Sequence, residues 1–220
     1  MIRNPAADRI VSRLMSPILS FPVPLGVVAL LAGGLAACRH ESAPAAAPTE
    51  PAVERPFPQA GRVNMHLSAG KYVIEGSPDD RIRVTAQTRD PADARKVRLD
   101  LQADGPEATL RTDGPSNGFE VAVAVPSRAD LWIRLSAGDL TIRAIDGHKD
   151  LSAWAGEMRV AVGDGATYRR VDASVLAGEI QAPALNRTTG GLFRSFSWTG
   201  PGEYDLRARL TAGEIHLRER

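Results

Sequence analysis

The sequence predicts an all-β domain, either a β-solenoid of the parallel β-helix kind or an antiparallel β-sandwich. From Gly61 onward, short β-like runs are separated by Gly, Pro and Asp, without a sustained 3.6-residue periodicity. An Ala-Gly corner recurs at five places, with apolar residues at fixed offsets on both sides of it. These phase-locked corners favour the solenoid, because stacked coils repeat one bend and a sandwich requires no such register.

The first 37 residues have the layout of an export signal. Three arginines precede an apolar run over residues 21–37, and the run ends in small residues. The tetrad LAAC that ends at Cys38 resembles the lipobox of bacterial lipoproteins, in which the thiol receives a diacylglycerol before cleavage. We therefore expect residues 1–37 to be a lipoprotein signal peptide and Cys38 to be lipidated. A simple cleaved signal is one alternative, and a retained anchor is another, although the run is short for a span of about 20 residues.

Residues 38–58 are rich in Ala and Pro and contain almost no large apolar residue. This composition predicts an extended or disordered tether. At about 3.1 Å per residue in polyproline geometry, the tether could hold a domain up to roughly 60 Å from a membrane. Arg39 follows the cysteine in place of the Asp that usually retains lipoproteins at the inner membrane. In a double-membraned bacterium, the outer membrane is therefore favoured.

Five corner glycines, each preceded by alanine, align the repeat of the predicted domain, residues 59–220. The residues three and five positions before each glycine, and two and four after it, are apolar. The residues seven positions before each glycine are apolar as well, with the single exception of Lys149. We expect these positions to face the core and to stack at about 4.8 Å per strand. The corner glycines are Gly70, Gly138, Gly156, Gly178 and Gly213.

The inward positions change phase at each corner. They fall at odd offsets before the glycine and at even offsets after it, so the alternation loses one residue there. A bulge or sharp bend keeps both faces in one core, and glycine can adopt the positive φ that such a bend often needs. From Gly138 onward, the corners follow at intervals of 18, 22 and 35 residues. The last interval is close to two coils with a degenerate corner near Gly190 or Gly200.

The N-terminal half is expected to be less regular and partly antiparallel. The first two corners lie 68 residues apart, and the stretch between them includes DLQADGPEATLR and FEVAVAVP. These stretches predict an antiparallel hairpin followed by a further strand. The polar sequence PADAR around Ala92 predicts either one helical turn or a loop.

Most late aromatic residues fall between Gly190 and Leu206. Core filling or a cap on the solenoid is one interpretation of this cluster, and an aromatic platform for sugars is the other. The residues concerned are Phe193, Phe196, Trp198 and Tyr204.

Four acids directly follow a corner glycine, whereas Lys71 takes this place in the first copy. Stacked coils would align Asp139, Glu157, Glu179 and Glu214 as a candidate cation or ligand column. Catalysis is disfavoured, because a repeat gives every coil the same carboxylate without separating an acid from a base. Solvated acids offset by nearby arginines are the default interpretation.

Composition excludes several classes of function. The chain carries 27 Lys and Arg against 26 Asp and Glu. Loss of residues 1–37, with three Arg and one Asp, leaves 24 against 25, so nothing points to nucleic acid. A single cysteine allows neither an intrachain disulfide nor a thiolate metal cluster. The four histidines are isolated, and GxSxG, P-loop and HExxH patterns are absent, so we expect no metal, no cofactor and no catalytic residue.

Residues 60–220 resemble the bacterial exported putative-adhesin domains of unknown function. The resemblance is carried by VPSRADLWIRLSAGDL and by the recurrent Ala-Gly-acid corners, whereas the long first interval departs from the pattern. It implies a β-solenoid, often on a lipoprotein or membrane-anchored chain, with no catalytic residues to carry over.

Together these features predict a non-enzymatic, lipid-anchored cell-envelope protein that presents its domain as an adhesin-like interaction or structural surface. The expected partners are a membrane, through lipidated Cys38, and an envelope protein or glycan. An exported glycan-active enzyme and a calcium- or small-ligand-binding module are the alternative functions.

Overall fold

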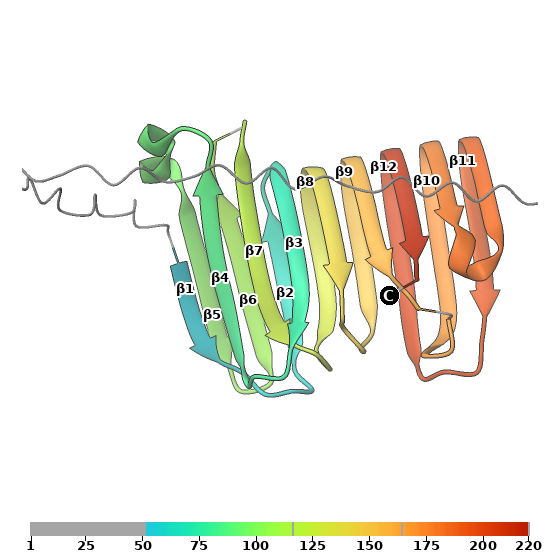
Figure 1. Cartoon of the computed structure of the whole chain (residues 1–220), viewed down its shortest axis with the longest axis horizontal. Coiled ribbons are helices and arrows are strands. Elements are labelled where there is room, and N and C mark those ends of the chain that lie inside the picture. Colours follow the sequence, from blue (N-terminus) through green and yellow to red (C-terminus); the bar gives the residue numbers. More distant parts are fainter. Residues whose placement is uncertain (1–51, 116, 164, 220) are drawn as a thin grey trace, which may run out of the picture. The chain divides into compact units, whose positions relative to one another are not determined.

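The computed structural model describes residues 52–219, apart from residues 116 and 164 (Figure 1). The predicted signal peptide, Cys38 and most of the predicted tether lie outside these residues. In chain order, the elements are β1 (Ala52–Pro56), β2 (Arg62–Leu67), β3 (Gly70–Ser77), β4 (Arg81–Thr88), the 3₁₀ helix η1 (Pro91–Lys96), β5 (Arg98–Asp104), β6 (Glu107–Asp113), β7 (Phe119–Pro126), β8 (Asp130–Arg143), β9 (Lys149–Ala161), β10 (Tyr168–Ala182), the 3₁₀ helix η2 (Pro183–Leu185), β11 (Arg187–Thr199) and β12 (Tyr204–Arg218).

The strands form one mixed, open sheet of 12 strands. Its main path runs β1-β4-β7-β3-β8-β9-β12-β10-β11, while β2, β5 and β6 pair off this path. From β7 to β10, neighbours on the path are parallel, and antiparallel pairs lie at the two ends. The all-β prediction is confirmed at the level of a mixed, open sheet.

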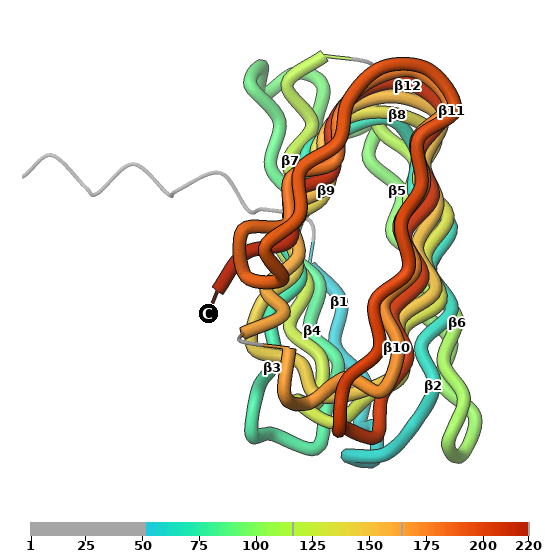
Figure 2. Tube along the Cα trace, turned by 90° about the vertical axis from the view of Figure 1, so that its right-hand side faces the viewer, coloured from blue at the N-terminus to red at the C-terminus, as the bar shows by residue number. Residues whose placement is uncertain are grey.

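The long strands β8, β9, β10 and β12 each bend, so that their two arms face each other across the core. The arch is visible in Figure 2, where these strands lie one behind another. The separate strands β2 and β3 supply the two arms of another such layer, because they pair with the first and second arms of β8. Strands β6 and β7 repeat this arrangement against β2 and β3.

Chain order and sheet order differ near the C-terminus. Strand β12 lies between β9 and β10 and is parallel to both. Because β12 runs parallel to β10, the chain must come back from the end of β10 to the side where β10 began before β12 can start. Strand β11, which is antiparallel to β10, brings the chain back. The degenerate corner expected near Gly190 therefore lies on β11, where Gly191 is opposite Gly178.

The predicted inward columns all face the core. Every residue at the five inward offsets from the corner glycines is buried, with at most 8% of its surface exposed. This includes Lys149, at 2% exposed. The register keeps equivalent positions side by side from strand to strand, so each column is continuous through the stack.

Close backbone approach explains why the corners require glycine. Four of the five corner glycines have a φ between +116° and +144°. In addition, a Cβ on Gly156 would lie 1.9 Å from the carbonyl oxygen of Gly138, and a Cβ on Gly213 would lie 1.9 Å from that of Gly156. Glycine is therefore needed for the bend and also for the contact between neighbouring bends.

The less regular N-terminal half is confirmed. Strands β5 and β6 form the predicted antiparallel hairpin, and β7 follows as the next strand. The polar stretch around Ala92 forms η1, capped by the Asp90 side chain, which accepts from the Ala92 N–H at 2.9 Å. Residues 52–56, placed in the tether by composition, form β1 and pair antiparallel with β4. None of the helices that the structure describes has the length and hydropathy of a membrane span.

Candidate functional site

The four predicted acids lie in one column on the outer surface, directly after the bend. The register places Lys71 beside Asp139, Asp139 beside Glu157, Glu157 beside Glu214, and Glu214 beside Glu179. The order differs from chain order because β12 lies between β9 and β10. The structure thus brings together all the predicted site residues that it describes, whereas Cys38 lies outside the described range.

His216 connects two of these acids, although the sequence shows it only as an isolated histidine. Its Nε2 lies 3.1 Å from an oxygen of Glu157 and 3.0 Å from an oxygen of Glu214. The Arg159 guanidinium also pairs with Glu157. Strand order creates this cluster, since β9 and β12 are neighbours in the sheet and distant in the chain. The apolar periodicity of the sequence carries no information on strand order, so it could not predict this cluster.

Within the described part of the chain, Glu157, Glu214 and His216 could hold a metal ion, because one ligand atom from each lies within 4.8 Å of the others. An imidazole with two carboxylates suits zinc-like ions better than calcium. However, His216 Nε2 lies within hydrogen-bond distance of both carboxylates and Arg159 pairs with Glu157, so each carboxylate already has a nitrogen partner. Cation binding by the acid column therefore stays a prediction.

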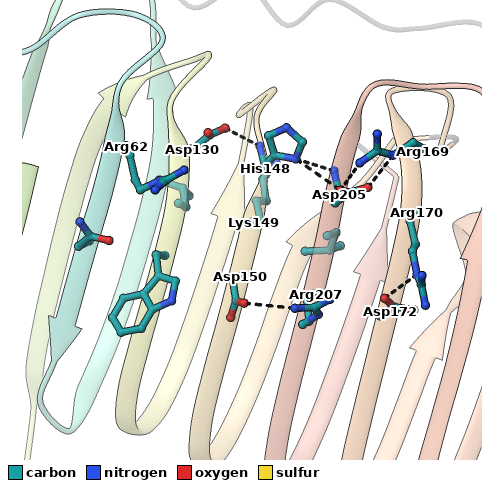
Figure 3. A pocket seen from close by; sticks show the side chains of 14 residues that line it. Arg62, Asp130, His148, Lys149, Asp150, Arg169, Arg170, Asp172, Asp205 and Arg207 are labelled. Atoms are coloured by element: carbon teal, nitrogen blue, oxygen red, sulfur yellow. Dashed lines mark hydrogen bonds and ion pairs between the residues drawn. The ribbon is translucent and has the colours of Figure 1, made fainter. Parts of the chain in front are cut away.

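A shallow pocket of about 750 Å³ lies over the first arms of β2, β8, β9, β12 and β10 (Figure 3). Charged side chains line most of it, and its acids have basic or N–H partners. The Asp130 carboxylate accepts from the backbone N–H of His148 at 2.8 Å, and Arg169 forms an ion pair with Asp205. The hydrogen bond from Arg169 holds the pKa of Asp205 below its usual value. An ionised carboxylate of this kind is a poor proton donor at neutral pH.

The centre of the same surface is a charge cluster around Asp150. Its carboxylate lies 2.9 Å from Arg134 Nη1 and 2.8 Å from Arg209 Nη2. The Arg134 guanidinium also stacks on Trp132, with 3.8 Å between Cζ and the ring centroid. Arg134 therefore covers one face of the indole.

Lys149 is a buried lysine at the edge of this pocket. Its Nζ donates to the carbonyls of Ile145 at 2.8 Å and Gly147 at 3.0 Å, and it lies 2.8 Å from the Tyr168 hydroxyl. Burial lowers the pKa of Lys149 to about 7, against a weaker opposing effect of Asp130. Burial also raises the pKa of Tyr168. The three partners match the three donors of an ammonium group, which explains how lysine is accommodated in an apolar column.

Four exposed apolar side chains lie at the bends of β9, β10 and β11, and β12, which carries Thr211 at the equivalent position, separates β9 from β10. We define this corner ridge as Trp154, Leu176, Leu192 and Phe193, whose exposed fractions are 70%, 44%, 65% and 79%. Trp154 and Leu176 each stand two residues before a corner glycine, and Phe193 lies opposite Leu176 in the register of β10 and β11. The sequence contains a pattern that could have predicted the ridge, because Trp154 and Leu176 are large apolar residues at positions that do not belong to the inward columns.

The late aromatic residues divide between the two interpretations. Phe196, Trp198 and Tyr204 are partly buried and pack against the core, as core filling requires. Phe193 instead is exposed and belongs to the corner ridge. The cluster therefore does not form one continuous aromatic platform.

Comparisons with known proteins support the fold only. No protein-family model matches the sequence, and neither does any curated protein sequence. The chain is similar to a solved structure of a putative cell adhesion protein from Clostridium sporogenes ATCC 15579. The TM-score is 0.50 at 10% identity, covering 78% of this chain and 100% of that one. A putative adhesin from Parabacteroides merdae ATCC 43184 matches with a TM-score of 0.27 at 10% identity, over 51% of this chain and 52% of that one.

Proposed function

We propose that this chain is a lipid-anchored protein of the cell envelope that presents a solenoid-like β-domain as an adhesin-like interaction surface, without enzymatic activity. The lipobox-like tetrad before the tether supports the anchor, and the fold shared with a protein named for cell adhesion supports the role. The pairing of the pocket acids with basic or N–H partners supports a binding role over a catalytic one.

The corner ridge is the observation that carries this proposal. Large exposed apolar residues gathered in one place typically mark interaction sites on a soluble domain. Burying one such side chain contributes about 1.5–3 kcal/mol, so the ridge could supply much of a binding free energy. Its side chains stand on strands held by stacked glycine corners, and a rigid surface loses little entropy on binding. A ridge of tryptophan, leucine and phenylalanine fits a protein partner better than a glycan, which also needs polar contacts.

A photocrosslinkable amino acid in place of Trp154 should capture an envelope protein in the cells that produce the full chain. The expected result is one discrete adduct, with a yield at least about five-fold lower when Leu176→Asp is added, since a charge there opposes desolvation. The same amino acid at Gln102, exposed on β5, serves as the matched control. Equal adducts at Trp154 and Gln102, or an adduct indifferent to Leu176→Asp, would show that the ridge is not the binding surface.

Labelled palmitate should enter the wild-type chain and should not enter Cys38→Ser. The reason is chemical, because Cys38 is the only thiol of the chain and therefore the only residue able to form the thioether of a lipoprotein. Gel autoradiography of whole cells provides the measurement, and membrane fractionation of the same cells provides the second readout. Incorporation into Cys38→Ser at the wild-type level would refute the anchor, as would its absence from both.

A further inference from the structure

Strand β11 is an edge of the sheet without the features that usually keep sheet edges apart. It has 13 residues, no proline, and charges only at Arg187 and Arg194. The strands at the opposite end differ, because β1 has five residues and ends at Pro56, and β5 carries three charged residues among its seven. A long, weakly charged edge strand presents backbone N–H and C=O groups as a template for another strand.

Apolar exposure is concentrated on the same strand. Leu192 and Phe193 are adjacent at its bend and are 65% and 79% exposed. Most other residues of β11 are also exposed, so no part of the described chain covers this edge. The edge therefore combines unpaired backbone with exposed apolar side chains.

We propose that β11 pairs antiparallel with β11 of a second copy of this chain, so that the two sheets join end to end about a two-fold axis. The strand bends at Gly191 to Phe193, with four residues before the bend and six after it, so antiparallel self-pairing can set each arm against the other. A two-fold axis at the bend exchanges the two arms, and each arm meets the other arm of the second copy. This inference goes beyond the proposed function, because it rests on the backbone edge of β11, although Leu192 and Phe193 belong to the corner ridge as well.

Two registers keep the side-chain alternation on both arms, one with Arg194 and one with Phe196 opposite Thr189 of the second copy, and the second brings Leu192 against Phe193. Trp198, Phe196 and Thr189 lie opposite buried residues of β10, so they face the core side of the sheet. Placing Phe196 opposite Thr189 of the second copy sets these inward positions, and Arg187 with Trp198, opposite one another, whereas the inward position of Arg194 falls opposite the corner glycine Gly191. The same register places Leu192 opposite Phe193 of the second copy, directly beside the two bends. The most exposed side chains of β11 then cover each other.

Charges along β11 are compatible with this register. Arg187 falls opposite Trp198 and Arg194 opposite Gly191, so no like charges oppose each other. Arg194 Nε donates to the carbonyl of Gly190 at 2.9 Å and would exchange this bond for backbone pairing. The absence of side chains at Gly190 and Gly191 leaves room for the arginine to move.

Cysteines at opposing positions test the register in the full chain. In the producing cells, Gly190→Cys with Ser195→Cys should form a disulfide-linked band at twice the monomer mass after mild oxidation, lost on reduction. Thr188→Cys with Ser195→Cys is two residues out of register and should cross-link at least about ten-fold less. Wild type, whose one cysteine is Cys38, gives the background. Equal yields in both pairs, or no dimer band in either, would overturn the proposal.

Two further substitutions in the Gly190→Cys, Ser195→Cys chain separate the strand edge from the ridge. Leu192→Lys should lower the dimer yield at least about ten-fold, because it places an ammonium group against the apolar contact. Trp154→Lys, on the ridge but away from β11, should leave the yield unchanged. An equal loss with Trp154→Lys would show that the ridge joins the copies. Disulfide adducts of another mass would show that a different protein's strand occupies the edge, and either result rejects self-pairing.

Discussion

Replacing Gly156 by alanine is expected to prevent the domain from folding, or to destabilise it by more than about 4 kcal/mol. The new Cβ would lie 1.9 Å from the carbonyl oxygen of Gly138, which is backbone and cannot rotate away. The backbone of Gly156 also has a φ of +127°, where an L-residue is strained by about 1–3 kcal/mol. Relieving the contact would separate β8 from β9 in the middle of the stack.

Gly190→Ala is the matched control for this substitution. Gly190 lies on the edge strand and its φ is not in the positive range. A Cβ there would meet the Glu179 side chain at 3.5 Å and the Gly178 carbonyl oxygen at 3.7 Å, which are ordinary van der Waals contacts. We expect its unfolding free energy to stay within about 0.5 kcal/mol of wild type. Urea unfolding followed by circular dichroism measures both variants. A Gly156→Ala domain as stable as Gly190→Ala would mean that the glycine contacts do not hold the stack together.

The Ala-Gly corners allowed the core-facing positions to be predicted from the sequence, but not the order of the strands in the sheet. The phase change at each Ala-Gly pair predicted which residues face the core, and the structure confirms those columns. Strand order could not be derived in this way, because every coil has the same pattern. Leu206 fits equally well beside Lys149 and beside Val171, and in the structure it lies between them. When every strand carries the same apolar pattern, the pattern fixes how two paired strands align, but it does not fix which strands are paired.

Two features of the site depend on that missing order. His216 reaches Glu157 only because β12 enters the sheet beside β9. The return strand β11 was hidden for another reason, since an antiparallel strand presents the corner in reverse and lacks the Ala-Gly-acid order. The acid column could be predicted, because it needs only the corner alignment. Its ion pairs could not.

The stability of the wild-type domain is expected to rise with pH between about 7.5 and 9.5, and Lys149→Met should remove most of this rise. In the folded state, burial lowers the pKa of Lys149 to about 7, whereas an unfolded lysine titrates near 10.4. Between these values the unfolded chain binds a proton that the folded chain has released, so the folded state gains stability as pH increases. Each pH unit in this window contributes up to about 1.4 kcal/mol, or about 2–3 kcal/mol in total. Methionine keeps the apolar stem and does not titrate.

Lys71→Met removes the same charge from an exposed position, with 54% of the lysine side chain accessible, and should follow wild type across the window. Urea unfolding at pH 7.5, 8.5 and 9.5 gives the three free energies for each protein. Tyr168 does not interfere, because a raised tyrosine pKa affects stability only as pH passes its unfolded value near 10. At pH 9.5 the methionine variant should be less stable than wild type, because it leaves the Ile145 and Gly147 carbonyls without their donor. A rise of equal slope in Lys149→Met and wild type would place the responsible titration elsewhere and would mean that Lys149 stays charged in the folded core.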